Sequence, residues 1–224
     1  MNRMEYMNSL LLKLIALTTM IIDHYGAIFQ PGNLTFRLIG RLAFPIYCFL
    51  LVEGFFHTKD VRKYSLRLLL FALISEFPFD YAFFGGVYWG HQNIFFTLFI
   101  GLIAMILLEK SKDGSYITKL LIGLGAAFIA TILSTDYAYI GIIYILAFYY
   151  THGITSLKRL SIVAAIMFLT NMIGSSGLQQ YSLIALIPLM MYNNKQGLKN
   201  KILQISFYAA YPLHLLIFAI LKLN

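Results

Sequence analysis

An aspartate and a histidine stand side by side deep within an apolar stretch of the chain. Asp23 and His24 lie inside Leu10–Phe29, which is long enough to cross a bilayer, and Lys13 lies near its end, where it can snorkel to the interface. Ionisable side chains at such depth are costly in lipid, so they usually face the protein interior and serve a function. A histidine beside carboxylates can act as a general base, because its pKa lies near neutrality and the carboxylate fixes its tautomer. We therefore expect His24 to be a general base.

The orienting partner of His24 is expected on another helix. Successive residues of a helix point about 100° apart, so Asp23 and His24 cannot easily bond to each other face to face. Glu76 and Tyr211 are the candidate partners, and Asp23 either orients His24 or contacts a neighbouring helix. The structural alternative is that Asp23 and His24 simply satisfy an interhelical hydrogen bond.

Further ionisable residues recur in the later apolar stretches, and their depths, at about 1.5 Å per residue, define two polar layers. The outer layer suits acid–base chemistry, and basic side chains in the inner layer can hold phosphates. The outer layer consists of Asp23, His24, Arg41, Glu76, Asp80, His91, Tyr211 and His214. The inner layer consists of Glu53, His57, Lys63 and Arg67.

Buried charge pairs also have a purely structural interpretation. Arg41 with Glu76, or Arg67 with Glu53, could simply lock two helices together. His57 and Lys63 of the inner layer lie beside a loop and could equally form a solvated face.

The composition is typical of a membrane protein. Of the 224 residues, 60% are hydrophobic and 12% are charged, against roughly 25% charged in an ordinary soluble domain. The net charge of +8 is spread over short loops between apolar runs, so no solvated basic domain is available to bind nucleic acid. The chain has one cysteine, Cys48, and no Cys/His spacing suggests zinc, so we expect no metal.

We predict an all-α transmembrane bundle of about nine spans (roughly eight to ten), forming one domain over residues 1–224. The candidate spans are Leu10–Phe29, Leu38–Phe56, Tyr64–Phe84, Asn93–Leu108, Lys119–Leu133, Ala138–Tyr150, Leu160–Met172, Leu183–Tyr192 and Ile202–Leu221. Basic residues concentrate in every second loop, which by the positive-inside rule places the N-terminus in the cytoplasm and the C-terminus outside. Arg37 and Arg41, beside the first external loop, break this rule and suggest a role other than topology.

Two stretches of the sequence resemble the TraX family, whose namesake N-acetylates F pilin. They are LLLKLIALTTMIIDHYGAIF and RLIGRLAFPIYCFLLVEGFFHTKDVRKYSLRLLLFALISEFPFD, which cover Leu10 to about Asp80. The aromatic block His91–Phe96 and the motif YPLH at Tyr211–His214 also fit, whereas residues from about 108 to 204 match only in hydropathy. The family is similar to a wider group of integral-membrane acyltransferases, which move acetyl from cytoplasmic acetyl-CoA to an acceptor on or across the membrane.

The resemblance implies an acetyl-CoA-dependent N- or O-acetyltransferase in the bacterial cytoplasmic (inner) membrane. Its partners would be acetyl-CoA, the lipid bilayer and an acceptor amine or hydroxyl on a peptide, a protein such as pilin, or a cell-surface molecule; a homodimer is an option. Such chemistry needs a base, donors for the thioester oxyanion and a site for CoA phosphates, and the two layers offer all three. We assign catalysis to His24, Asp23, Arg41, Glu76, His214 and Tyr211, with Arg41 or His214 at the oxyanion. We assign CoA binding to Glu53, His57, Arg62, Lys63 and Arg67, and acceptor binding to Arg37, Asp80, His91 and Asn93.

Two other functions stand as alternatives. Intramembrane Asp, Glu and His also build the proton relays of transporters, although this chain lacks the repeated Gly/Pro-broken helices that many transporters show. A non-catalytic assembly factor of a pilus or secretion complex would tolerate changes at His24. Flux into proteoliposomes and acetyl-CoA binding separate the transporter from the transferase.

Overall fold

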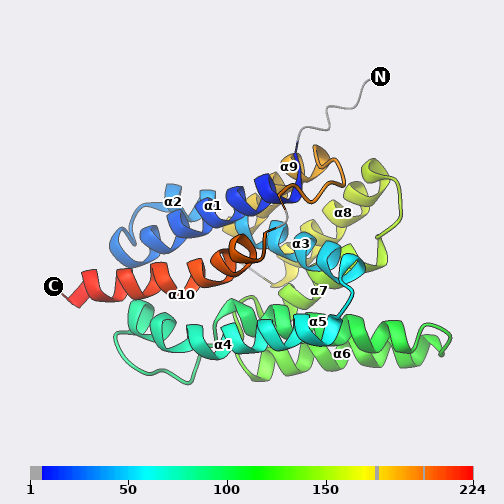
Figure 1. The fold of residues 1–224 in the computed structure, drawn as a ribbon, viewed down its shortest axis with the longest axis horizontal. Helices are drawn as coiled ribbons and strands as arrows, with labels where there is room; N and C mark the ends of the chain where they lie inside the picture. The colour runs from blue at the N-terminus through cyan, green and yellow to red at the C-terminus, as the bar shows by residue number, and fades with distance from the viewer. Residues whose placement is uncertain (1–6, 175–176, 199, 224) are drawn as a thin grey trace.

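The computed structural model describes residues 7–174, 177–198 and 200–223, and this part of the chain is helical without β-strands, as predicted. Figure 1 shows the arrangement of the elements along the chain. The α-helices are α1 (Ser9–Phe29), α2 (Leu34–Gly40), α3 (Ala43–His57), α4 (Val61–Phe84), α5 (Ile94–Lys110), α6 (Tyr116–Ile132), α7 (Ala138–Tyr150), α8 (Ser156–Gly174), α9 (Leu186–Met190) and α10 (Lys201–Leu223). A 3-10 helix, η1 (Gly177–Ala185), precedes α9.

The long helices run roughly along the long axis of the molecule (Figure 1). Helix α10 lies between α1 and α4 and contacts both, so the last helix of the chain packs against two of the first. The loops at 30–33 and 85–93 lie toward one end, and those at 58–60 and 111–115 lie toward the other. The two polar layers predicted from the sequence therefore fall toward opposite ends of one bundle.

Four helical stretches within the described ranges are long and apolar enough to cross a membrane. They are Ser9–Phe29, Leu34–His57, Ser156–Gly174 and Lys201–Leu223. Three further apolar segments are shorter, namely Tyr116–Ile132, Ala138–Tyr150 and Gly177–Met190. These helices are those of a membrane protein with several spans, whereas the number nine and the orientation stay predictions.

The predicted span Leu38–Phe56 falls within the apolar stretch Leu34–His57, which consists of two helices rather than one. Helix α2 gives way to α3 through a tight turn at Arg41 and Leu42. Pro45 accounts for the break, because it has no N–H to donate to the Arg41 carbonyl and its ring would clash with that carbonyl in a regular helix. The turn places Arg41 at the junction of two helices.

The predicted span Leu183–Tyr192 is also irregular. It is occupied by the end of η1 and by the five-residue α9. Pro188 cannot donate a hydrogen bond to the Ile184 carbonyl, which disfavours one continuous α-helix through this segment.

Glu53 pairs with Arg159, so the predicted pair of Glu53 with Arg67 is wrong. The Arg159 Nη1 lies 3.1 Å from the Glu53 Oε1, and the two side chains are only 10% and 8% exposed. Arg159 also donates to the Phe148 carbonyl at 3.3 Å and lies over the ring of Phe49, 4.9 Å from its centroid. This cluster joins α3, α7 and α8, which hydropathy alone could not relate to one another.

Reporter fusions test the orientation of the bundle. The alternation of basic loops predicts that a reporter at Lys110–Lys112 reports the cytoplasm and that one at Gly85–Gly86 reports the outside. A fusion at the N-terminus should agree with the first. The reverse pattern at both loops would overturn the orientation.

Removing one partner of the Glu53–Arg159 pair should destabilise the protein strongly. Glu53→Ala leaves the Arg159 charge buried and unpaired, which we expect to cost about 3–5 kcal/mol of unfolding free energy. Thermal unfolding in detergent measures this effect, with Arg62→Ala, an exposed residue of α4, as the control. The double change Glu53→Leu with Arg159→Met should recover most of the loss, because two apolar side chains leave no orphaned charge. A melting curve of Glu53→Ala like that of the wild type would contradict the argument.

Candidate active site

A cavity of about 250 Å³ collects most of the predicted outer layer. Aromatic rings from α3, α4 and the segment before α7 complete its walls. The polar residues that line it include Asp23, His24, Arg37, Arg41, His91, Asp136 and Tyr211, and the rings are those of Phe44, Phe79, Phe83, Phe84 and Tyr137.

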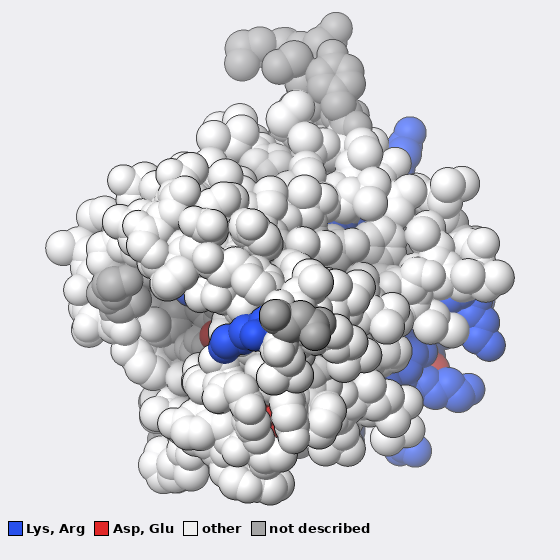
Figure 2. Space-filling view, turned by 90° about the vertical axis from the view of Figure 1, so that its left-hand side faces the viewer, with Lys and Arg blue, Asp and Glu red and all other residues white. Residues whose placement is uncertain are grey.

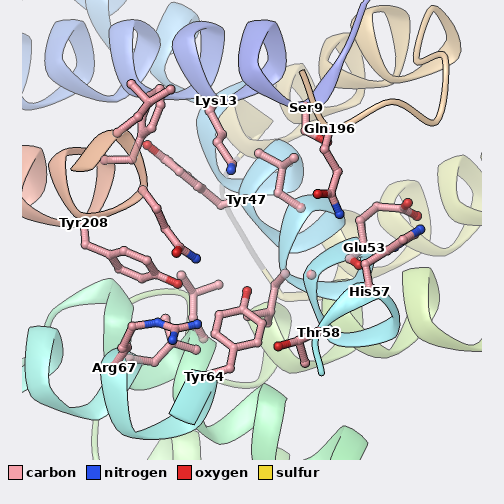
Figure 3. A pocket seen from close by; sticks show the side chains of 18 of the residues that line it. Ser9, Lys13, Tyr47, Glu53, His57, Thr58, Tyr64, Arg67, Gln196 and Tyr208 are labelled. Atoms are coloured by element: carbon pink, nitrogen blue, oxygen red, sulfur yellow. The ribbon is translucent and has the colours of Figure 1, made fainter. Parts of the chain in front are cut away.

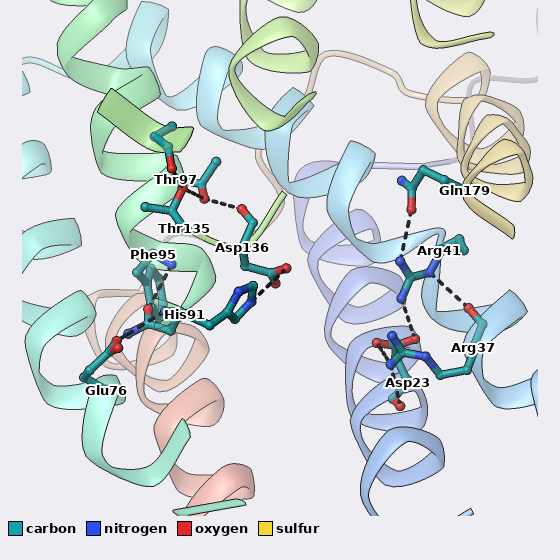
Figure 4. Close-up of polar contacts among 12 residues, drawn as sticks. Asp23, Arg37, Arg41, Glu76, His91, Phe95, Thr97, Thr135, Asp136 and Gln179 are labelled. Atoms are coloured by element: carbon teal, nitrogen blue, oxygen red, sulfur yellow. Dashed lines mark hydrogen bonds and ion pairs between the residues drawn. The ribbon is translucent and has the colours of Figure 1, made fainter. Parts of the chain in front are cut away.

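Asp23 lies between two arginines (Figure 4). Its Oδ2 accepts from the Arg37 Nη1 at 2.7 Å, and its Oδ1 accepts from the Arg41 Nη2 at 3.0 Å. Arg41 also donates to the Gln179 Oε1 at 3.0 Å, and its Nε donates to the Arg37 carbonyl at 3.2 Å. The predicted pair of Arg41 with Glu76 is therefore wrong. The alternative that Asp23 contacts a neighbouring helix is confirmed.

Two glycines allow α2 to approach α1 closely enough for these ion pairs. A Cβ atom at Gly40 would overlap the side chain of Asp23, and one at Gly26 would overlap the ring of Phe36. Because glycine has no Cβ, the backbones can come together at both positions. Gly40 precedes Arg41 directly, so the close approach and the ion pair arise from neighbouring residues.

His24 contacts a second histidine across the interface of α1 and α10. The His24 Nδ1 lies 2.7 Å from the His214 Nε2, and the two rings are nearly parallel, at 17°. The His214 Nδ1 in turn lies 2.7 Å from the Ala210 carbonyl oxygen. The ring of Tyr211 stands edge-on to His24, with the centroids 5.8 Å apart. The orienting partner on another helix is thus His214, and the prediction of Glu76 or Tyr211 for this contact is wrong.

Glu76, Asn93 and Asp80 hold the start of α5 and the loop before it, and none of them lines either cavity. The Glu76 Oε2 accepts from the backbone N–H of Asn93 at 3.2 Å and from its side-chain amide. Asn93 caps α5, since its Oδ1 accepts from the Phe95 N–H at 3.0 Å. The Asp80 Oδ2 accepts from the Tyr88 N–H at 2.9 Å. These contacts hold the backbone at the start of α5 and in the loop before it.

His91 faces a carboxylate in a different loop. Its Nε2 lies 3.8 Å from the Asp136 Oδ1, and both residues line the outer cavity. The interaction with the Asp136 carboxylate raises the pKa of His91 above its ordinary value. Gln92 ties the same loops together, because its N–H donates to the Ser134 carbonyl at 3.0 Å and its carbonyl accepts from the Asp136 N–H at 2.9 Å. The loops before α5 and α7 therefore form one unit at the outer end.

A larger cavity of about 660 Å³ collects the predicted inner layer (Figure 3). Two carboxylates line it and both are paired, Glu53 with Arg159 and Asp60 with Lys63 at 3.3 Å. The Nε of Arg67 is buried without a hydrogen-bond partner among the described residues. The basic residues of its lining are Lys13, Lys59, Lys63, Arg67 and Lys201, and His57 also takes part, whereas Arg62 does not.

The two cavities share part of their walls. Met20, Tyr47, Ile94 and Tyr211 line both of them. Tyr211 is 3% exposed, and its hydroxyl makes no well-formed hydrogen bond within the described part of the chain. The Tyr211 hydroxyl lies beside the Ile94 N–H, at the start of α5. The O–H of Tyr211 therefore has no acceptor among the described residues, at the point where the cavities adjoin.

The innermost polar residues of the outer cavity, Asp23, His24 and Arg41, lie below the surface. Figure 2 shows the end of the molecule at which α10 finishes, and most of this face is uncharged, with a basic side chain near its centre and others along one edge. Asp23 is 9% exposed and His24 is 8% exposed. The side chains of Arg37, His91 and Asp136 are more accessible, at 28%, 39% and 33% exposed, so the outer cavity is only partly screened from solvent.

Sequence reasoning missed Lys13, Asp136 and Gln179. Lys13 points into the inner cavity in Figure 3, although its position in the chain indicated snorkelling to the interface. Asp136 gave one usable signal, because it is an acidic residue in a loop without Lys or Arg. Gln179 gave none, since its contact with Arg41 joins residues 138 positions apart.

The geometry is that of a helical membrane protein with two adjoining polar cavities. The family described as "TraX protein" matches residues 8–222, and the chain belongs to this family. The match includes the middle of the chain, where the resemblance rested on hydropathy alone.

Two relatives are similar to parts of the chain. One is the "Probable fimbrial assembly protein FimC, serogroup H1" of Dichelobacter nodosus, 36% identical over 113 residues, which cover 43% of this chain and 44% of that protein. The other is an uncharacterized protein of Rickettsia prowazekii (strain Madrid E), 32% identical over 75 residues, which cover 34% of this chain and 27% of that protein. The aligned part spans less than half the length of each relative. No solved structure is significantly similar to the chain.

The contact of His91 with Asp136 should stabilise the protein at low pH. Because the pKa of His91 is raised in the folded state, this stabilisation is fully present below the ordinary value of 6.5 and is lost as the pH rises through the folded value. His91→Gln should therefore lower the melting temperature more at about pH 5.5 than at about pH 8.5. The side chains are 39% and 33% exposed, so the difference will be small. Equal destabilisation at both pH values would contradict the contact, and Asp136→Asn should reproduce the pattern of His91→Gln.

Proposed function

We propose that this chain is a membrane-embedded acetyltransferase, which moves an acetyl group from acetyl-CoA to an acceptor amine or hydroxyl. Membership of the TraX family supports the proposal. The observation that carries it is the shared wall between a basic cavity and a cavity lined by His24. An enzyme that joins a phosphate-bearing donor to an acceptor on the other side of a membrane needs both sites next to each other.

The inner cavity suits the phosphates of CoA. Its volume of about 660 Å³ lies within the range of small-molecule sites. Lys13 and Arg67 form no ion pair within the described ranges, so their charges are available to an anion. Phosphates accept strong charge-assisted hydrogen bonds from such groups. We assign phosphate binding to Lys13, Lys63 and Arg67, and acetyl-CoA, when bound, supplies an activated thioester.

In the outer cavity, His24 would take the proton from the acceptor amine or hydroxyl. An oxygen that gains negative charge during the transfer needs a hydrogen-bond donor that is not already engaged. Arg41 is bound to Asp23 and Gln179, and the His214 Nε2 is bound to His24. The hydroxyl of Tyr211 stands where the cavities adjoin, and we favour it over Arg41 and His214 as this donor.

A peptide or protein acceptor fits the name of the fimbrial assembly relative. A pilin-like subunit would approach from the outer end, with the inner cavity facing the cytoplasm and the protein in the bacterial cytoplasmic membrane. The aromatic rings of the outer cavity would hold the apolar part of such an acceptor.

A non-catalytic role in fimbrial or pilus assembly is the second candidate, because the name of the same relative favours it. An assembly factor needs the fold but not the base. Fimbriation of cells that carry His24→Ala, combined with mass spectrometry of their membrane proteins, separates the two. Normal assembly with an unchanged set of acetylated products would support the assembly factor.

His24→Ala tests the proposed base. General-base catalysis typically contributes roughly 10²–10⁴-fold, so the variant should lose at least about a hundredfold in turnover. It should still insert into the membrane and bind acetyl-CoA, as measured by calorimetry. His152→Ala is the control, since His152 is a histidine that lines neither cavity. Near-normal transfer by a folded, CoA-binding His24→Ala variant would remove His24 from the mechanism.

Lys13→Met and Arg67→Met test the proposed phosphate site. Hydrogen bonds to charged groups are worth about 1.5–3 kcal/mol, so each change should weaken acetyl-CoA binding by about 10-fold to 100-fold. Lys110→Met is the control, because Lys110 is an exposed lysine that does not line the cavity. Unchanged binding in both variants would place the donor site elsewhere.

A further inference from the structure

A chain of two short contacts runs from the backbone of α10 to the outer cavity. It begins at the carbonyl oxygen of Ala210, which can only accept hydrogen bonds. The His214 Nδ1 lies 2.7 Å from this oxygen and must therefore carry the proton of that contact. The protonation of His214 is thus set by the backbone of its own helix.

The second contact also determines which ring nitrogen of His24 carries the proton. A neutral imidazole with a proton on Nδ1 has a lone pair on Nε2, so the His214 Nε2 accepts. The His24 Nδ1, 2.7 Å away, must then be the donor. Neutral His24 consequently has no proton on Nε2, and no hydrogen bond to that nitrogen occurs within the described residues. His24 lines the outer cavity, whereas His214 does not.

The surroundings favour two neutral rings. His24 is 8% exposed and His214 is 7% exposed, and no carboxylate contacts either imidazole within the described part of the chain. The charged groups that act on His24 are Arg37 and Arg41, which are both bound to Asp23, and Tyr211 faces both rings. An imidazolium in this place would be a buried charge without a partner, which is costly.

We infer that His214 is a positioning residue, which holds the Nδ1 proton of His24 and leaves the Nε2 of His24 free to accept a proton in the outer cavity. The inference rests on the proposed function for the use of that lone pair, whereas the tautomer follows from the contacts alone. The arrangement does for His24 what an aspartate does in a Ser-His-Asp triad, with a neutral acceptor in place of a carboxylate.

Nitrogen NMR of the full chain with ¹⁵N-labelled histidine, in nanodiscs, tests the tautomer without any assay of activity. Loss of signals in His24→Gln and His214→Gln assigns the two rings. We expect both rings to be neutral, with protons on Nδ1 and bare Nε2 nitrogens. A proton on the Nε2 of His24, or an imidazolium at His214, would overturn the inference.

Two replacements of His214 test its role in turnover. In His214→Gln the side-chain oxygen can still accept from the His24 Nδ1, so the spectrum of His24 should be kept and turnover should fall by less than about tenfold. In His214→Leu no acceptor remains, so the His24 ring should populate both tautomers and turnover should fall by at least about a hundredfold, with acetyl-CoA binding unchanged. Equal turnover in the two variants would overturn the inference. If the spectra fit but wild-type protein transfers no acetyl group, the proposed function fails and the tautomer assignment stands.

Discussion

The outer half of the protein depends on one buried carboxylate held between two guanidinium groups. Asp23 is 12% exposed at its side chain and binds Arg37 and Arg41, so the carboxylate and both guanidinium groups each have a partner of opposite charge in a poorly solvated place. The contact needs the close approach at Gly40 and the turn that Pro45 forces after Arg41. Through Gln179, Arg41 also fixes η1 against α2. One ion-pair cluster thereby sets the relative positions of α1, α2 and η1.

The ion-pair cluster around Asp23 also supports the contact that the next residue, His24, makes with His214. Because Asp23 is directed at α2, the adjacent His24 points elsewhere on α1 and meets α10. Helix α10 is held in place by α4 as well, and Lys222 near its end donates to the Ala82 carbonyl at 3.1 Å. The histidine pair is therefore formed by helices that are each fixed independently. A 2.7 Å contact between two rings requires such support, since a small shift of either helix would break it.

Charged side chains are paired differently at the two ends of the bundle. At the inner end, carboxylates neutralise Arg159 and Lys63, and Lys13 and Arg67 are left facing a cavity without an ion pair among the described residues. At the outer end, Asp23 pairs with both arginines near His24, and no carboxylate contacts the imidazole itself within the described part of the chain. The cavities proposed for anion binding and for proton transfer are thus separate, with Tyr47 and Tyr211 in the wall between them. This division is what an acetyl transfer across a membrane would require.

The sequence by itself determined the helical membrane class, most helix limits, the family and the division of ionisable residues into two groups. Hydropathy and the cost of charge in lipid suffice for this, since both act locally along the chain. The identity of each partner was decided by tertiary structure. Arg41 binds Asp23 where Glu76 was expected, Glu53 binds Arg159 where Arg67 was expected, and His24 contacts a histidine 190 residues away. Depth estimates give the level of a residue in the bilayer but not its direction around the helix axis. Only the packing of helices distant in sequence fixes which side chains meet.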